Sequence, residues 1–147
     1  MSYSNEQALV QGFVESLRDE RTPWNCIHIS TEFFYQRGRT DVIALDDAGN
    51  VIAFEAKLTN WRGALQQAYR NTCFANLSYV VLPKPVAMRA CRFLAEFERR
   101  NVGICYIDAN DLRILHEASA VDPVQPWLAT RAVASMTAVS RHESTTA

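Results

Sequence analysis

The chain has 147 residues, of which 48% are hydrophobic and 21% are charged. This composition suits one folded domain with a single hydrophobic core and excludes a largely disordered chain. The net charge of −1 does not by itself indicate a nucleic-acid-binding protein. No apolar run approaches the ~20 residues that span a bilayer, and the N-terminus lacks the basic and apolar regions of a secretion signal. We therefore expect a cytoplasmic protein that does not enter a membrane.

The four cysteines, which lie far apart in apolar surroundings, are predicted to be free thiols. No two of them form a C-x-x-C pair. Metal motifs normally contain ligands in close pairs, and a reducing cytoplasm disfavours disulfides. Neither zinc nor a disulfide is therefore expected at Cys26, Cys73, Cys91 or Cys105.

The first half of the chain predicts one helix followed by three strands. Leu9, Phe13 and Leu17 recur at helical spacing, which predicts an amphipathic helix over 5–19. Runs rich in β-branched and aromatic residues, separated by turn sequences, then predict three successive strands. These strands are expected over 26–35, 40–45 and 51–57.

The second half alternates helices and strands, which implies crossover connections and a sheet covered on both faces. The elements expected here are a helix over 61–75, a strand over 78–82, a helix over 86–100 and a strand over 102–107, with a further strand over 112–115. Beyond residue 117 the periodicity weakens, and we expect only a loose helix over 127–139.

The second and third strands predict a hairpin with a defined register. If the loop 46–50 joins them, Leu45 faces Val51 and Asp41 faces Glu55, and Lys57 lies two residues beyond. These odd-numbered residues then share one face. The opposite face is apolar and is predicted to hold Thr40, Val42, Ala44, Ile52, Phe54 and Ala56.

Two directly opposed acids repel one another unless a cation lies between them. Mg²⁺ prefers oxygen ligands and keeps several waters, one of which can act as a nucleophile. Lys57 could orient that water or stabilise the negative charge of a transition state. The same residues also fit a solvent-exposed hairpin in which Lys57 only neutralises Asp41 and Glu55.

The motif and the order of elements resemble the PD-(D/E)XK nuclease superfamily, especially its archaeal resolvase-like and Mrr-like branches. Gly38-Arg39-Thr40-Asp41 matches the segment of the first acid, and Glu55-Ala56-Lys57 matches the (D/E)xK element. The resemblance implies an α/β protein with a restriction-endonuclease-like αβββαβαβ core, in which helices cover both faces of a mixed central sheet. It assigns residues 1–116 to the nuclease-like domain and 117–147 to a C-terminal extension, partly helical or disordered.

The resemblance also implies a function and its residues. It predicts a nuclease that depends on Mg²⁺ (or Mn²⁺), with DNA rather than RNA as the expected substrate and a homodimer as a further expectation. Asp41 and Glu55 would be the metal ligands and Lys57 the catalytic lysine. Two further residues on helices are implied: a supporting acid at Glu6, with Glu15 as the alternative, and a glutamine at Gln67. Asn71 stands where many members carry a tyrosine.

Arginine dominates the basic residues, since only Lys57 and Lys84 of the 15 are lysines. A guanidinium binds phosphate with two parallel hydrogen bonds, so the bias fits a phosphate-facing surface, although a GC-rich genome explains it equally well. The arginines expected to contact nucleic acid flank the motif and are Arg37, Arg39, Arg62 and Arg70. Those of the helix over 86–100 are expected on a solvated face. Aromatic residues of the 61–75 segment, such as Tyr69, are expected to pack in or at the edge of the core.

Two other functions remain open. The chain could be a degenerate member of the fold that binds nucleic acid or protein without turnover, although the intact Asp41, Glu55 and Lys57 argue against this. It could also be an inhibitor-like interaction protein whose acidic cluster mimics phosphate.

Overall fold

A six-stranded mixed sheet forms the centre of the computed structural model, which describes residues 3–19, 22–36, 38–108 and 111–145, the last seven by their backbone alone. The strands lie side by side in chain order. The pairs β1–β2, β2–β3 and β5–β6 are antiparallel, whereas β3–β4 and β4–β5 are parallel. The strands are β1 (Cys26–Tyr35), β2 (Gly38–Asp46), β3 (Val51–Ala56), β4 (Leu77–Pro83), β5 (Gly103–Asp108) and β6 (Asp111–His116).

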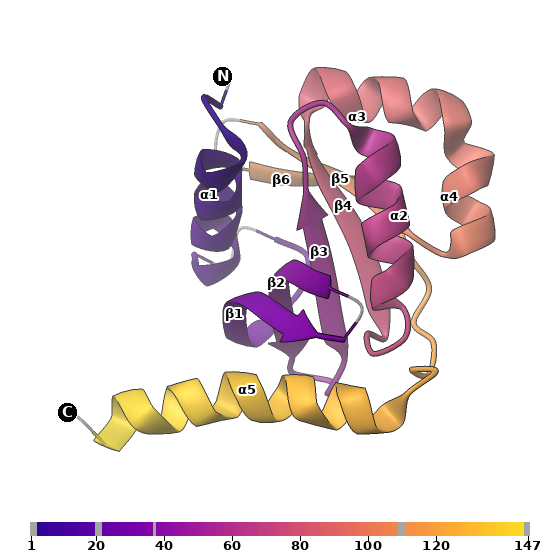
Figure 1. Ribbon diagram of the computed structural model, residues 1–147. Coiled ribbons are helices and arrows are strands. Elements are labelled where there is room, and N and C mark those ends of the chain that lie inside the picture. The colour runs from indigo at the N-terminus through magenta and orange to yellow at the C-terminus, as the bar shows by residue number, and fades with distance from the viewer. Residues whose placement is uncertain (1–2, 20–21, 37, 109–110, 146–147) are drawn as a thin grey trace.

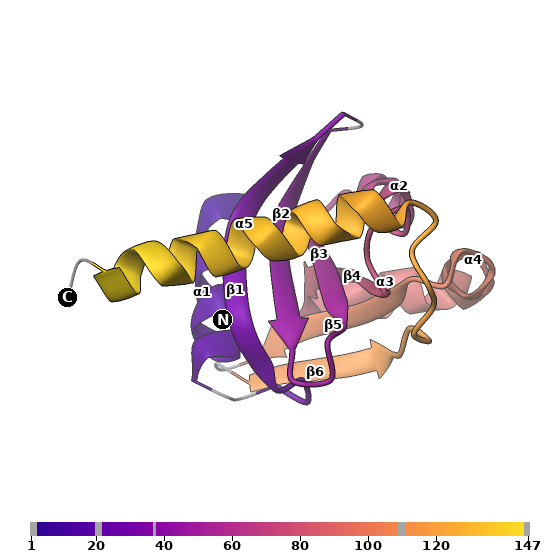
Figure 2. The ribbon, with the colours of Figure 1, turned by 90° about the horizontal axis from the view of Figure 1, so that it is seen from below.

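Helices cover both faces of the sheet (Figure 1). On one face lies α1 (Glu6–Arg18), and on the other lie α2 (Trp61–Asn71), α3 (Lys84–Ala90) and α4 (Leu94–Arg100). The last helix, α5 (Pro126–Thr145), crosses β1, β2 and β3 on the α2 side (Figure 2). Within the described part of the chain, no helix is both long and apolar enough to cross a membrane. The predicted fold class, an α/β core with helices on both faces of a mixed sheet, is confirmed.

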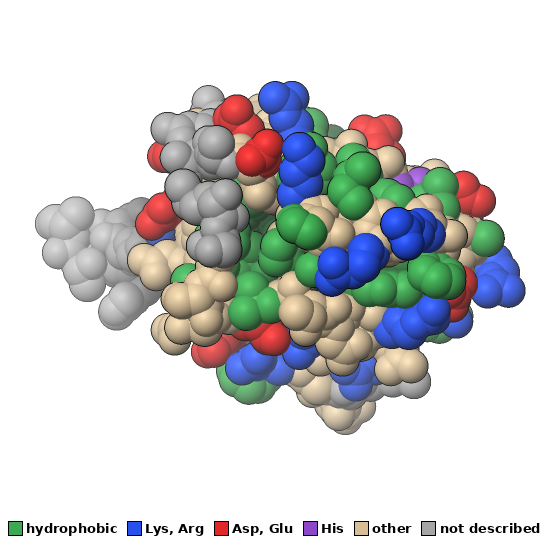
Figure 3. Space-filling model, turned by 90° about the horizontal axis from the view of Figure 1, so that it is seen from above, with side chains coloured by type: hydrophobic (Ala, Val, Ile, Leu, Met, Phe, Trp, Pro, Cys, Tyr) green, Lys and Arg blue, Asp and Glu red, His purple; other side chains and the backbone are tan. Residues whose placement is uncertain are grey.

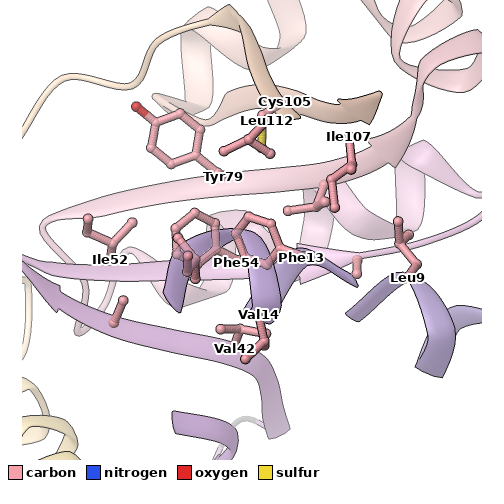
Figure 4. Close-up of a cluster of buried hydrophobic side chains, with 14 residues drawn as sticks. Leu9, Phe13, Val14, Val42, Ile52, Phe54, Tyr79, Cys105, Ile107 and Leu112 are labelled. Carbon is pink, nitrogen blue, oxygen red and sulfur yellow. The ribbon is translucent and has the colours of Figure 1, made fainter. Parts of the chain in front are cut away.

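The α1 face of the sheet owes its packing to aromatic contacts. Phe13 of α1 lies edge-on to Phe54 of β3, with ring centroids 4.6 Å apart, and Trp24 contacts Phe54 and Tyr79 in the same way. Figure 4 shows Phe13, Phe54 and Leu9 together among the buried side chains of this cluster. Burying such side chains contributes ~1.5–3 kcal/mol each. This packing holds α1 in a fixed position against β3.

The prediction of one continuous helix over 86–100 is wrong. A turn of 3-10 helix (Cys91–Phe93) separates α3 from α4. The chain leaves the helical conformation at Phe93, where φ is −119° and ψ is 36°. The Phe93 ring stacks on Trp61 of α2, with ring centroids 5.2 Å apart. The break in the helix therefore coincides with a tertiary contact, which the periodicity of the sequence does not reveal.

The segment expected as a C-terminal extension contributes to a hydrophobic cluster. Leu128, Ala132 and Met136 of α5 are buried together with residues of β1, β2 and β3, among them Phe33 and Ile43. The spacing of four residues places these three side chains on one stripe of the helix. That stripe faces the sheet.

Replacing Met136 should therefore destabilise the whole protein. We expect Met136→Ala to lower the free energy of unfolding by ~2–5 kcal/mol because it leaves a cavity under α5. The exposed Thr130→Ala on the same helix should change it by less than ~0.5 kcal/mol. Urea unfolding monitored by circular dichroism measures both. Equal stability of the two variants would mean that α5 is dispensable for the fold.

Candidate active site

Asp41 and Glu55 lie together at the end of the β2–β3 ladder. The ladder has the predicted register, with Leu45 opposite Val51 and Ile43 opposite Ala53. Val42 and Phe54 are the last residues that this ladder pairs. At the next position, side chains make the hydrogen bonds between the two strands. The backbone N–H of Asp41 donates to Glu55 Oε1 at 3.3 Å, and the N–H of Ala56 donates to Asp41 Oδ2 at 2.9 Å. Each carboxylate therefore binds the backbone of the opposite strand.

A twist of the β1–β2 pair explains how Asp41 comes to point across the strands. Glu32 of β1 has a φ of 58°, a left-handed conformation that is uncommon outside glycine. Val42 of β2 belongs to the hydrophobic cluster under α1. Phe33, the residue after Glu32 in β1, belongs to the cluster under α5 on the opposite face. The side-chain alternation of β2 changes face between Thr40 and Val42. The prediction that Thr40 shares the apolar face with Val42 is therefore wrong.

Glu55 is a buried acid with an unusual pKa. Only 1% of the residue is exposed to solvent. Burial, and next the negative charge of Asp41, raise the pKa of Glu55 to about 8, although hydrogen bonds from Asn71 and from the Asp41 backbone oppose this shift. A buried acid beside a second acid is costly to ionise unless a cation is added. Acids with strongly perturbed pKa values cluster at functional sites, which makes this pair a candidate site.

Asn71, at the end of α2, holds Glu55 in place. Its Oδ1 accepts hydrogen bonds from the hydroxyl groups of Tyr35 and Thr40, both at 2.8 Å. These two donors fix the orientation of the amide, so that Nδ2 points to Glu55 Oε2 at 3.4 Å. In the sequence, Asn71 stands out only as a departure from the family pattern, and no role is predicted for Tyr35. The sequence offers one signal for a role of Asn71: asparagine is a poor helix former, and it stands at the end of the helix that carries Gln67.

Lys57 lies at the rim of the site, directly after β3. Its backbone N–H donates to the carbonyl of Val81 in β4, which continues the strand by one position. Its Nζ lies 3.6 Å from Glu6 Oε1 at the first turn of α1. The β2–β3 ladder ends before Arg39 and Lys57, so these two residues do not pair across the strands. Arg39 contacts Asp41 at 3.4 Å and Glu32 at 3.5 Å instead.

Two grooves lie on either side of these residues. The acidic groove, of about 620 Å³, runs along α1 and is lined by Arg18, Arg39 and four acids. The acids are Glu6, Glu15, Glu32 and Asp41. It therefore contains both acids predicted on the first helix, Glu6 and Glu15, of which Glu6 pairs with Lys57.

The α2 groove, of about 650 Å³, lies on the other side of Lys57 and contains Gln67. Its cations are Lys57, Arg70 and Arg100, and Asn60 and Gln66 add further amides. Arg100, expected on a solvated face, thus lines a groove. Tyr69, predicted to pack in or at the edge of the core, also lines this groove and is 52% exposed, so it does not lie inside the core.

The described arginines that were predicted to contact nucleic acid have different surroundings. Arg39 adjoins Asp41, and the positive charge of Arg70 lowers the pKa of Glu55. Arg62 lies elsewhere, stacked over Trp61 at 4.3 Å and bonded to Glu96. Arg37 lies outside the described residues. Figure 3 shows basic side chains interspersed with hydrophobic and neutral ones over one face, so the small net charge conceals local basic areas.

The donor set suits a hard divalent cation held by few protein ligands. Asp41 and Glu55 offer carboxylate oxygens at one place, and Mg²⁺ is commonly bound by one or two carboxylates with waters and phosphate oxygens. Among the described residues, no three His, Cys, Asp or Glu side chains are grouped to hold a metal ion. The site thus fits a cation that shares its coordination with water and substrate better than an all-protein zinc cage.

Solved structures share this fold, and a repair endonuclease is among them. No protein-family model and no curated protein matches the sequence. A protein of unknown function from Silicibacter pomeroyi superposes with a TM-score of 0.67 at 17% identity, covering 97% of this chain and 90% of that one. A repair endonuclease from Pyrococcus abyssi superposes with a TM-score of 0.50 at 16% identity, covering 74% of this chain.

The second likeness concerns part of a larger protein, since the superposition spans 49% of the endonuclease chain. The structure of Pyrococcus furiosus SfsA in complex with Ca²⁺ has a TM-score of 0.48 at 12% identity, covering 77% of this chain and 64% of that one, and is too remote to carry an inference. At these identities the likenesses establish the fold alone.

The raised pKa of Glu55 predicts a pH dependence of stability. Between its ordinary value of 4.5 and about 8, the folded protein holds a proton that the unfolded chain has lost. The free energy of unfolding contributed by Glu55 should therefore fall as pH rises through this window, in the presence of a chelator. Glu55→Gln should remove this part of the slope. Urea unfolding between pH 5 and pH 8 tests this, and identical slopes in the two proteins would contradict it.

Removing Asn71 should destabilise the site. Asn71→Ala leaves the Tyr35 and Thr40 hydroxyls without their acceptor and Glu55 Oε2 without its donor, which should lower the free energy of unfolding by ~1–3 kcal/mol or more. Gln66→Ala, an exposed position on the same helix, serves as the control and should have little effect. Thermal unfolding of both variants measures the difference. Comparable melting temperatures would show that the Asn71 network is not stabilising.

Proposed function

We propose that this protein is a divalent-metal-dependent nuclease of the PD-(D/E)XK type that hydrolyses phosphodiester bonds, with DNA rather than RNA as its substrate. The observation that carries the proposal is the contact of buried Glu55 with Asp41, at the end of a strand that continues directly into Lys57. Two acids that are costly to ionise together, beside an ammonium group, suit a site that receives a cation and a phosphate.

Asp41 and Glu55 would hold Mg²⁺ or Mn²⁺. When bound, such an ion neutralises phosphate charge and lowers the pKa of a bound water. The protein's own contribution is to fix the two carboxylates, and the backbone N–H groups of Asp41 and Ala56 together with Asn71 do this. Preorganised ligands of this kind need no rearrangement when the substrate arrives.

Lys57 acts as the catalytic lysine in this proposal. Glu6, with its Oε1 3.6 Å from Lys57 Nζ, keeps the side chain extended toward the rim and lets it reach a phosphate oxygen. An ammonium group there stabilises charge that develops on the phosphate in the transition state. The role of Glu6 is thus to position Lys57. Gln67, on the wall of the α2 groove, would contact the substrate next to it.

Arginines flank this centre and would contact the phosphates of the substrate strand. Arg39 and Arg70 are the best supported, because Arg39 contacts Asp41 and the charge of Arg70 acts on Glu55. Arg37 and Arg62 remain predictions from the sequence, and so does a homodimer.

Cleavage assays test the proposal directly. We expect wild-type protein to cleave DNA in Mg²⁺ or Mn²⁺ and to be silent with a chelator. Lys57→Ala should lower the cleavage rate by at least ~100-fold because it removes a charge that acts in the transition state. Plasmid and labelled oligonucleotides, both single-stranded and duplex, provide the substrates.

Lys84→Ala is the matched control, since Lys84 is the only other lysine and pairs with Asp108 of β5. It should cleave at the wild-type rate. Equal activity of the Lys57 and Lys84 variants, or equal activity with and without chelator, would contradict the proposal. Metal-dependent DNA binding without cleavage would favour the non-catalytic alternative.

A further inference from the structure

The α2 groove differs from the acidic groove in charge, although both adjoin the proposed catalytic residues. Three cations line it, Lys57, Arg70 and Arg100, and no Asp or Glu is among its lining residues. The acidic groove carries four acids against two arginines. A phosphate backbone is attracted by the first and repelled by the second. A substrate strand that reaches Lys57 therefore continues along α2 rather than along α1.

One helix face builds the wall of this groove. Gly63, Gln66, Gln67 and Arg70 follow the i, i+3, i+4, i+7 spacing that aligns side chains on one stripe of a helix. Glycine at the start of the stripe has no side chain to fill the groove. The volume of about 650 Å³ is in the range of sites that enclose a small organic ligand, so the groove can admit a nucleotide.

Tyr69 presents an aromatic ring in this groove. It is 52% exposed, whereas Ala68 beside it is fully buried against the sheet. An exposed phenol ring next to cations is the combination by which proteins bind single strands, since every nucleobase has a face that stacks on a ring. In a continuous duplex the bases are already stacked on one another and do not offer that face.

Amide side chains complete the groove. Asn60 Oδ1 accepts the N–H of Gly63 at 3.0 Å, which leaves the NH₂ group of Asn60 available as a donor. Gln67 Oε1 is buried and has no hydrogen-bond partner within the described part of the chain. An unsatisfied buried oxygen is costly, and a rotation of the Gln67 amide into the groove would let the exocyclic amine of a nucleobase supply the missing donor.

We propose that the α2 groove binds an unpaired nucleotide of the substrate strand, next to the phosphodiester bond presented to Lys57. Tyr69 stacks on the base, the amides contact its edge, and Lys57, Arg70 and Arg100 contact the flanking phosphates. This inference rests on the proposed nuclease function and narrows its substrate to DNA with a single-stranded segment, such as an overhang, a flap or a free single strand.

Fluorescence anisotropy tests the inference without catalysis. Wild-type protein, in chelator, is titrated into labelled 16-nucleotide single strands and blunt duplexes of the same sequence. We expect the single strand to bind at least tenfold more tightly. An abasic site scanned along the single strand should weaken binding by about 5- to 150-fold at one position, the range measured for base–aromatic stacking. This scan needs no protein variant and is independent of folding.

Variants then assign the stacking to Tyr69. Tyr69→Ala should weaken single-strand binding by the same factor as the abasic site, and the two changes together should cost no more than either alone. Tyr69→Phe should bind as wild type because it keeps the ring. Phe34→Ala is the matched control and should have no effect, since Phe34 is an exposed aromatic (64%, against 52% for Tyr69) that does not line the α2 groove.

The outcomes separate this inference from the proposed function. Equal affinity for duplex and single strand, or equal binding by the Tyr69→Ala and Phe34→Ala variants, overturns the inference even if metal-dependent cleavage is observed. Tyr69-dependent binding of single strands supports it, and if no substrate is then cleaved, only the proposed catalysis fails. If RNA single strands bind with the same dependence on Tyr69, the groove is confirmed and the preference for DNA is overturned.

Discussion

The burial of Glu55 beside Asp41 is the constraint on which the site depends. An acid that is 1% exposed next to another acid is unfavourable in its ionised form, and a hydrophobic side chain at position 55 would avoid that cost. The protein instead surrounds Glu55 with donors from β2 and α2. Such an arrangement is stable when Glu55 is protonated or when a cation joins the two carboxylates, which is the behaviour of a binding site rather than of a structural core.

Much of the surrounding structure serves to hold this pair. The left-handed residue Glu32 twists the β1–β2 hairpin, so that Thr40 turns toward α2 while Val42 still packs under α1. Because the face changes between them, Asp41 points across to β3 and binds the N–H of Ala56. The hydrophobic clusters on the two faces fix α1 and α2, and these helices bring Glu6 to Lys57 and Asn71 to Glu55.

Local patterns predicted the order of elements and the hairpin register, because both follow from period-2 alternation and turn chemistry that neighbouring residues determine. Leu45 does face Val51, and Asp41 does meet Glu55. The change of face at Thr40 could not be predicted, since it follows from a non-glycine residue with positive φ on another strand. The break at Phe93 likewise depends on a contact with Trp61, which lies 32 positions earlier in the chain (93 minus 61).

The residues of the candidate site also divide into those that local sequence patterns predict and those that they do not. Asp41, Glu55 and Lys57 could be selected because their spacing on a hairpin is local. Asn71 and Tyr35 could not, because their importance comes from hydrogen bonds between β1, β2 and α2 that form only in the folded protein. Tyr69 was misjudged because an aromatic residue on an amphipathic helix is more often buried, and its exposure becomes apparent only when α2 is placed against the sheet.

The central claim is that Asp41 and Glu55 share one divalent cation. Titration of Mn²⁺ followed by electron paramagnetic resonance, with wild type, Asp41→Asn and Glu55→Gln, tests it most directly at pH 8. The account predicts a single bound Mn²⁺ per chain, which is lost in each variant. It also predicts a weaker affinity for Mn²⁺ at pH 6, where a larger fraction of Glu55 is protonated. Unchanged Mn²⁺ binding in either variant would contradict it.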